Sequence, residues 1–571
     1  MTGIKAFLVA LVLAIGLAVL GSTPPRPLPP SAYAEDFSAG RAMGDVERIA
    51  RAPHPSGSAE FAALRGYLMS RLESMGLTVR TQQGAFPEPA RAWLNKQAGT
   101  DAAAIPLVNV IGVLPGRDPK LPAVALMAHY DSVPGSPGAA DDGAGVAAIL
   151  ETLRVLSLDD QRRRDVIVIL TDGEESGLVG ARLFFAQAPE ARRIGAVVNL
   201  EARGGGGKAN LFQTSAMNGE AVRAWTASAP HPAGTSLATF IYSVLPNDTD
   251  LTLALPKGYA AWNIAFIGRP RLYHSPLATA DRLDQGALQQ MGEQALGLAR
   301  TLSRAETLPG KAPDVVFFDV FGLFVVHYAA WWGWAMLAVG LAGYAALATR
   351  DFRLRALLGG AARMLGLMAA AGAGLYLLNL LSGADGPVDY YDRLAAIPRL
   401  QAMALCACLS AALVFVGKGS APGSGEAGLV LPLLLAAAVF QALAPTAAYV
   451  LAVPIMLGGV AALLRLREDR ARGWGAVASV LVAGVVGGYA LMLGFALMQA
   501  VGAMMPAVAV LPLALVCAVF VPLRTPLAKA PLRAAAALVL AAAAIALWVR
   551  LDAPADSIPT YSEARVLGVK G

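Results

Sequence analysis

Long apolar runs fill the second half of the sequence. Each run is close to the roughly 20 residues that a helix needs to cross a lipid bilayer. A further apolar run, residues 5–22, lies near the amino terminus. Together they predict nine membrane spans, although residues 428–466 could hold either one kinked helix or two. The runs of the second half are 328–348, 360–382, 399–416, 428–444, 446–466, 474–498, 502–522 and 531–549.

Residues 1–34 contain an apolar segment with the pattern of a membrane anchor or a signal peptide, and this segment is followed by the Pro-rich linker Pro24–Pro30. The apolar run follows a single lysine, Lys5, and the triplet Ala32-Tyr33-Ala34 resembles a cleavage site. An uncleaved anchor is favoured because the triplet lies rather far from the apolar run. Under either interpretation the residues that follow are sent across the membrane.

Between residues 35 and 304 short apolar runs alternate with helical patterns. Strands are expected at Val124–Ala128, Val166–Leu170 and Val197–Leu200, with helices at Gly145–Leu156, Leu178–Ala188 and Gln285–Leu302. This alternation predicts an α/β layered domain with a largely parallel sheet, in which functional groups gather at the carboxyl ends of the strands. We therefore expect an extracytoplasmic α/β domain over 35–310, an all-α membrane domain over 311–549 and a tail over 550–571.

Composition and charge agree with a membrane protein. Hydrophobic residues make up 56% of the chain and charged residues only 15%, which is too apolar for an ordinary soluble protein. The net charge of +6 does not indicate nucleic acid binding, because the basic residues of the second half form short clusters between apolar runs. We expect a lipid bilayer as a partner and no nucleic acid.

The same clusters predict the orientation. With a cytoplasmic amino terminus, every basic cluster falls in a cytoplasmic loop, as the positive-inside rule requires. The α/β domain then lies outside the cytoplasm, and we expect a multi-pass protein of a bacterial inner membrane. The clustered residues are Arg350, Arg353, Arg355, Lys418, Arg465, Arg467, Arg470, Arg472, Arg524, Lys529 and Arg533.

Metal-binding chemistry has few residues to draw on. All three cysteines lie in apolar runs, so the α/β domain has neither a disulfide framework nor thiolate ligands. The five histidines are His54, His129, His231, His274 and His327. A metal site must therefore combine histidines from this set with carboxylates.

Histidine and carboxylate residues follow the predicted strands. The segments are His129-Tyr130-Asp131, Asp141-Asp142, Asp172-Gly173-Glu174-Glu175 and Glu201, and a later segment supplies Tyr273-His274. Such a set suits zinc, because one carboxylate can bridge two ions while each ion takes one histidine and one further carboxylate. Asp131, two residues from His129, could fix the tautomer of that histidine. Taken singly, each segment is more typical of an ordinary loop or a solvated helix start.

In order and spacing, these segments resemble the M28 metallopeptidases, many of which are two-zinc aminopeptidases. The resemblance covers about residues 45–304, and the segment 53–58, the motif Asn247–Asp250 and the multi-span tail are similar to the branch with carboxy-terminal membrane helices. It implies a zinc-exopeptidase-like three-layer α/β/α domain with a largely parallel mixed sheet. It also implies two Zn²⁺ ions per chain and a cis peptide bond between Asp141 and Asp142.

The resemblance also implies a role for each site residue. Asp141 would bridge the ions, His129 and Glu201 would bind one ion, and Glu175 and His274 would bind the other. Glu174 would be the general base, Asp131 would orient His129, and Tyr273 would donate to the oxyanion. Two positions depart from the common pattern: many relatives have Asp in place of Glu201, and many have an acidic residue in place of Ala278.

The function expected from these residues is hydrolysis of peptides by a membrane-bound two-zinc aminopeptidase. One alternative is a single-zinc acyltransferase of the glutaminyl-cyclase type. Another is a membrane transport or scaffolding protein whose outer domain binds peptides without cleaving them. Few ionisable residues fall well inside the predicted spans, which argues against a transport pathway.

Overall fold

The chain forms two compact units in the computed structural model. Residues 24–326 form the sheet unit, and residues 1–23 together with 327–555 form the helical unit. The structure describes residues 3–386, 389–417, 421–467, 473–523, 531–552 and 554.

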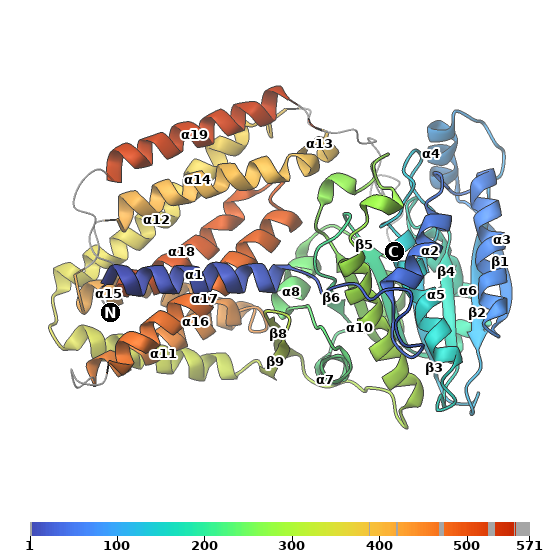
Figure 1. The fold of residues 1–571 in the computed structure, drawn as a ribbon, viewed down its shortest axis with the longest axis horizontal. Helices are drawn as coiled ribbons and strands as arrows, with labels where there is room; N and C mark the ends of the chain where they lie inside the picture. The colour runs from blue at the N-terminus through green and yellow to red at the C-terminus, as the bar shows by residue number, and fades with distance from the viewer. Residues whose placement is uncertain are drawn as a thin grey trace. The chain divides into compact units, whose positions relative to one another are not determined.

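The sheet unit is built on a seven-stranded mixed sheet with the strand order β1-β2-β4-β3-β5-β7-β6 (Figure 1). The four central strands β4, β3, β5 and β7 run parallel to one another. At the edges, β2 pairs antiparallel with β4, β1 pairs antiparallel with β2, and β6 pairs antiparallel with β7. The largely parallel mixed sheet that the sequence predicts is therefore confirmed. The strands are β1 (Thr78–Ala85), β2 (Pro106–Leu114), β3 (Ala123–His129), β4 (Val166–Thr171), β5 (Ile194–Ala202), β6 (Asn210–Thr214) and β7 (Ala260–Phe266).

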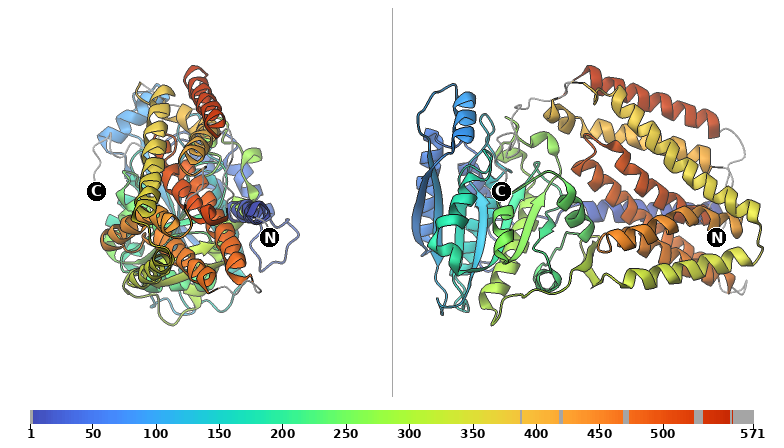
Figure 2. Two further views of the ribbon diagram at one scale, coloured as in Figure 1. Left: turned by 90° about the vertical axis from the view of Figure 1, so that its left-hand side faces the viewer. Right: turned by 180° about the vertical axis from the view of Figure 1, so that it is seen from behind.

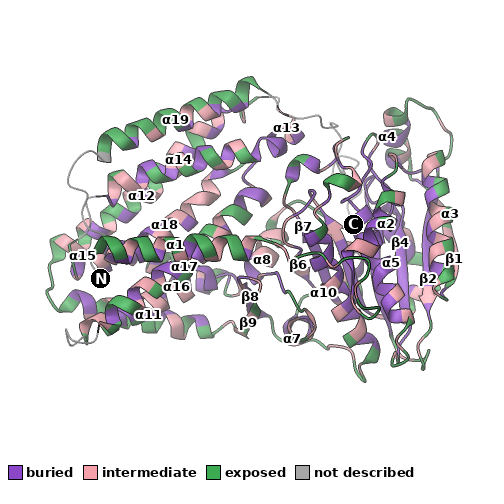
Figure 3. Ribbon diagram, in the orientation of Figure 1, coloured by how far each residue is buried: buried purple, intermediate pink, exposed green. Residues whose placement is uncertain are grey.

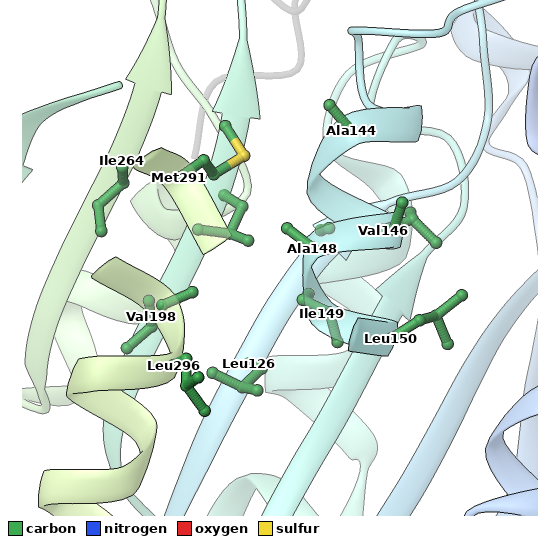
Figure 4. Close-up of a cluster of buried hydrophobic side chains, with 14 of the residues drawn as sticks. Leu126, Ala144, Val146, Ala148, Ile149, Leu150, Val198, Ile264, Met291 and Leu296 are labelled. Carbon is green, nitrogen blue, oxygen red and sulfur yellow. The ribbon is translucent and has the colours of Figure 1, made fainter. Parts of the chain in front are cut away.

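Helices cover both faces of this sheet, which explains why its central strands are continuous apolar runs. Leu126 of β3 packs in one core cluster with residues of α5 (Gly143–Ser157) and α10 (Gln285–Arg304), as Figure 4 shows. Its neighbour Met127 points to the other face and packs in a second cluster. That cluster contains residues of α6 (Val179–Gln187) and α9 (Leu251–Ala254), so the unit has three layers.

Five further α-helices belong to the sheet unit. They are α2 (Ala39–Ile49), α3 (Ala59–Ser74), α4 (Glu88–Ala98), α7 (Gly219–Ser228) and α8 (Ser236–Val244). Of these, α2 packs on α5 and α10, whereas α8 packs on β6.

A hairpin of β8 (Val315–Val320) and β9 (Phe324–Ala329) follows the α/β elements. Its first strand belongs to the sheet unit: Phe317 is fully buried against the Trp225 ring, and Lys208 Nζ donates to Asp319 Oδ2 at 3.1 Å. This hairpin lies in the region predicted to be all-α from residue 311 onward, and it was not predicted because two apolar runs of six residues fit a strand as well as a helix end.

The helical unit contains nine helical segments long and apolar enough to cross a membrane, counted over the described residues. The 428–466 region holds two helices, separated at Pro445. The helices are α1 (Gly3–Ser22), α11 (Trp332–Thr349), α12 (Leu354–Leu381), the short α13 (Tyr390–Ala395), α14 (Ile397–Phe415), α15 (Ser424–Leu443), α16 (Tyr449–Leu466), α17 (Trp474–Ala500), α18 (Val510–Phe520) and α19 (Pro531–Leu551).

These helices pack side by side, as α12, α14 and α19 do in both views of Figure 2. Helix α1 lies against α17, where a side chain at Gly488 would meet the Ala14 carbonyl at 2.9 Å. The outward side chains are apolar, for example Val12, Leu377 and Leu540, and Figure 3 shows how much of these helices is exposed. An apolar exposed surface on helices of this length defines a multi-pass membrane protein.

Part of the predicted topology falls outside the described residues. Among the loop charges this applies to Lys418, Arg470, Arg472, Arg524 and Lys529, and it also applies to the tail from residue 555 onward.

Candidate metal centre

The carboxyl ends of three adjacent parallel strands bring the predicted site residues together. His129 is the last residue of β3, Glu201 is the penultimate residue of β5, and the loop after β4 carries Glu174 and Glu175. Asp141 directly precedes the Asp142 cap of α5, and His274 follows β7. Parallel strands end at one edge of a sheet, so residues distant in sequence converge there.

Asp141 lies at the centre of this group. Its Oδ1 is 3.0 Å from Nε2 of His129, and its Oδ2 is 3.1 Å from Nε2 of His274. Each histidine has a second carboxylate beside the same nitrogen: Glu201 Oε1 at 3.5 Å from His129 and Glu175 Oε1 at 3.1 Å from His274. Two histidine–carboxylate groups are therefore joined through one shared carboxylate.

The donor set fits a metal centre. The ligand atoms of His129, Asp141 and Glu201 lie within 4.8 Å of one another, and so do those of Asp141, Glu175 and His274. The Asp141 and Glu201 side chains are only 10% and 12% exposed, and the two histidines 1% each. Carboxylates gathered at such depth repel one another unless a cation lies among them.

The pKa values of these groups show the same need for positive charge. Burial, together with the neighbouring charge of Asp141, raises the pKa of Glu175 to about 7, and burial raises that of Glu201 to about 7. Burial alone would lower the pKa of His274, but Glu175 and Asp141 raise it to about 10. Glu175 and Glu201 thus hold protons more readily and the imidazole of His274 gains one, whereas the hydrogen bonds from His129 and His274 lower the pKa of Asp141 against its burial. This is the response of an anionic cluster without its cation.

Asp131 contacts the site in two ways. Its backbone carbonyl accepts from Nδ1–H of His129 at 3.0 Å, whereas its carboxylate is 3.5 Å from that nitrogen. The carboxylate instead accepts from the backbone N–H groups of Glu174 at 3.2 Å and Glu175 at 3.4 Å. The main chain of Asp131 fixes the His129 tautomer, and its side chain fixes the loop after β4.

Glu174 is buried beside the candidate ligands. It forms a third possible metal-holding group with His129 and Glu175. Burial raises its pKa well above the ordinary value, and the charges of Glu201 and Glu175 raise it further. Such a carboxyl group can hold a proton at neutral pH.

Two further expectations concern the loops around the centre. The peptide bond between Asp141 and Asp142 is cis, as the resemblance implies. The Tyr273 ring stacks on the His274 ring with centroids 3.8 Å apart and an interplanar angle of 25°. Tyr273 therefore lies next to the centre.

Further buried polar residues near the centre have no role in the sequence prediction. Asp172 accepts from Ser56 Oγ at 2.6 Å and from the Val108 N–H at 2.7 Å, which ties the segment 53–58 to the loop after β4. His54 is buried, and its backbone N–H donates to Ser132 Oγ at 3.0 Å. Asp172 could have been identified from the sequence as a residue near the site, because it directly follows the predicted strand Val166–Leu170 and the residue Thr171.

Residues 109–299 match the family model described as Peptidase family M28. This match contains every candidate ligand, from His129 to His274. The chain therefore contains an M28 peptidase domain, and the family that the sequence motifs resemble is confirmed.

Curated relatives are membrane proteases and endoplasmic-reticulum metallopeptidases. Endoplasmic reticulum metallopeptidase 1 of Mus musculus is 32% identical over 313 residues, which is 51% of this chain and 34% of the relative. Vacuolar membrane protease of Eremothecium gossypii is 31% identical over 309 residues, 52% of this chain and 30% of the relative. The chain thus spans about a third of the length of these relatives.

Solved structures resemble part of the chain. The aminopeptidase from Aneurinibacillus sp. strain AM-1 is 16% identical, covers 49% of this chain and 97% of its own, and has a TM-score of 0.39. The glutaminyl cyclase of Porphyromonas gingivalis is 20% identical, covers 46% and 98%, and has a TM-score of 0.37.

Proposed function

We propose that the protein is a membrane-bound peptidase that holds two zinc ions and removes residues from the amino ends of peptides. The observation that carries this proposal is the arrangement around Asp141. Its two oxygens face Nε2 of His129 and Nε2 of His274 at 3.0 and 3.1 Å, and each histidine has its own second carboxylate. A carboxylate shared in this way suits a bridge between two cations.

Each ion would have three protein ligands. His129, Asp141 and Glu201 would hold one ion, while Asp141, Glu175 and His274 would hold the other. Nitrogen and oxygen ligands without thiolates suit zinc, and three protein ligands leave room for water or substrate. When bound, the ions polarise the scissile carbonyl and lower the pKa of water.

Proton transfer would be the task of Glu174. The side chain takes a proton from the attacking water and returns it to the leaving amine, a role that its buried position and raised pKa support. The Asp131 carboxylate keeps the Glu174 main chain in place. Tyr273, stacked on His274, would donate a hydrogen bond to the oxygen on which negative charge develops.

The decisive test uses the full chain purified in detergent. We expect about two zinc ions per chain and release of amino-terminal residues from a peptide library. Turnover should disappear with a chelator and return with zinc, and peptides with a blocked amino terminus should resist cleavage. A metal-loaded protein that cleaves none of these peptides would exclude the peptidase and leave a non-catalytic peptide-binding role.

The same preparation separates the peptidase from a glutaminyl-cyclase-type acyltransferase. That enzyme would hold one metal ion and cyclise amino-terminal glutamine without releasing an amino acid. Peptides that begin with glutamine are therefore included in the library. About one zinc per chain together with cyclised products would replace the hydrolase assignment.

The proposed location of the site is outside the cytoplasm of a bacterial inner membrane. Basic residues lie between α11 and the first turn of α12 (Arg350, Arg353, Arg355) and at the end of α16 (Arg465, Arg467). These ends would face the cytoplasm under the positive-inside rule. Residues 24–326 would then lie on the opposite side. In sealed cells, an impermeant maleimide should label a cysteine placed at exposed Ser243 but not one placed at exposed Asp351.

A further inference from the structure

Tyr242 of α8 is held in place by its aromatic ring. The ring meets the Phe212 ring of β6 edge to face, with centroids 4.7 Å apart and an interplanar angle of 78°. Helix α8 packs on β6, which fixes the direction in which the side chain leaves the helix. This edge-to-face packing is enough to explain an aromatic ring at position 242, but it gives no role to the hydroxyl group.

The hydroxyl group of Tyr242 is in a different situation. Its oxygen is buried, and within the described part of the chain it has no hydrogen-bond partner. The Thr249 hydroxyl comes near but does not reach hydrogen-bond geometry, and Thr249 Oγ1 already accepts from Asn263 Nδ2 at 2.8 Å. A buried hydroxyl without a partner is unfavourable, so its presence in a folded protein calls for a compensating role such as contact with a ligand.

Hydrogen bonds lead from this hydroxyl to the Glu201 strand: its neighbour Thr249 accepts from Asn263 Nδ2 at 2.8 Å, and Asn263 Oδ1 accepts from Asn199 at 2.9 Å. Asn199 lies two residues before Glu201 on β5. Burial raises the pKa of the phenol, and the negative charges of Glu201 and Glu174 raise it further, with a contribution from Asp248. The hydroxyl therefore stays protonated and acts as a donor. The ionised carboxylates of the centre can bind metal or accept hydrogen bonds but cannot donate one. A neutral phenol beside them would supply a hydrogen-bond donor.

We propose that Tyr242 is a substrate-contacting residue whose O–H donates a hydrogen bond to a carbonyl oxygen of the bound peptide. This inference rests on the proposed peptidase function. It differs from the expected role of Tyr273, which lies on the His274 side of the centre. Tyr242 instead comes from α8, next to Thr249 and the Asn263–Asn199 pair that leads to Glu201 on β5.

Tyr242→Phe tests the proposal, because phenylalanine keeps the ring packing and removes only the donor. In the full chain we expect kcat/KM for the best peptide to fall about 10- to 100-fold, the range for losing one donor to a developing charge. Zinc content and Tm should match those of the wild type, since no hydrogen bond inside the protein is lost.

The matched control is Tyr328→Phe. The Tyr328 hydroxyl in β9 is also buried without a partner among the described residues, and its electrostatic neighbour is Tyr449 rather than a residue of the metal centre. Turnover by this variant should equal that of the wild type. A similar loss in both variants would overturn the proposal, because the effect would not depend on the position beside Glu201.

A pair of inhibitors gives a second readout. The amide of the preferred amino acid carries a carbonyl oxygen, and the matching amine without the carbonyl does not. Tyr242→Phe should weaken binding of the amide about tenfold and leave the amine unchanged. An active wild type with an unchanged Tyr242→Phe variant overturns this inference alone, as does loss of zinc from the variant. An inactive, metal-loaded wild type instead overturns the proposed function on which it rests.

Discussion

The carboxylate of Asp131 holds the main chain of Glu174: the Glu174 N–H donates to Asp131 Oδ1 at 3.2 Å. The neighbouring Glu175 N–H donates to Oδ2 at 3.4 Å, and the Asp131 carbonyl accepts from His129 Nδ1 at 3.0 Å. Asp131 thus connects His129 and Glu175, a candidate ligand from each half of the centre, with Glu174, the candidate general base.

Asp131→Asn should disturb the position of Glu174, the candidate general base, more than the hydrogen bond between His129 and the Asp131 carbonyl. The carbonyl that holds His129 is kept, but an amide NH₂ replaces one oxygen that accepts from the loop. We expect kcat/KM to fall about 10- to 100-fold, the usual cost of losing support around a metal ligand. Peptide turnover and zinc content measured together test this. Unchanged turnover would show that the loop does not depend on the carboxylate.

Glu174→Gln should separate metal binding from proton transfer. Glutamine has nearly the same shape but cannot take a proton, so kcat should fall about 10²- to 10⁴-fold. Zinc stoichiometry should stay at the wild-type level, because Glu174 is not one of the five assigned ligands. An undiminished rate in the zinc-loaded variant would remove Glu174 from the mechanism.

Zinc stoichiometry should distinguish the bridging ligand from a terminal one. Asp141→Ala removes a ligand from both ions and should bring zinc below one per chain, whereas Glu201→Ala should leave about one. Glu190→Ala, which breaks an ion pair with Arg80 on β1, is a control that should retain the wild-type content. Equal zinc loss from Asp141→Ala and Glu201→Ala, measured by elemental analysis, would argue against the bridge.

The buried carboxyl group of Asp250 should make stability depend on pH. Burial raises its pKa to about 6, above the ordinary value of 3.8. Between these values the unfolded chain releases a proton that the folded chain keeps, so stability falls as pH rises. The upper bound is about 3 kcal/mol for a shift of about two units.

Asp250→Asn removes this titration. In metal-free protein, the variant should gain stability relative to the wild type as pH rises from about 4 to 7, and the gain should vanish near pH 4. The measured quantity is the difference in Tm between the two proteins, because other groups titrate in both. A difference that is constant over this range would contradict the assigned pKa.

The borders of the sheet unit predict which fragment folds. Residues 24–326 include β8, with the fully buried Phe317, and the segment in which Leu28 N–H donates to Gln289 of α10. A fragment of residues 35–310 lacks both. Loss of a buried phenylalanine alone costs about 3–5 kcal/mol. The longer fragment should therefore unfold cooperatively at a clearly higher temperature, and equal melting temperatures would show that β8 adds no stability.

The sequence by itself determined the two kinds of structure in this protein. Long apolar runs predict the spanning helices because a bilayer demands a fixed length of apolar helix. The continuous apolar runs before His129 and after Asp165 predict β3 and β4, because strands buried on both faces are apolar throughout. The family could also be identified from the sequence, since its motifs keep their order along the chain.

Only the tertiary structure decided which atoms meet. That Asp141 presents one oxygen to each histidine depends on the register of β3 against its neighbours and on the loop before α5. The hairpin β8–β9 and the placement of the buried Tyr242 hydroxyl could likewise not be predicted from the sequence, because each depends on long-range packing. A linear pattern reports local periodicity, whereas the distance between side chains 100 residues apart is fixed by how the layers pack.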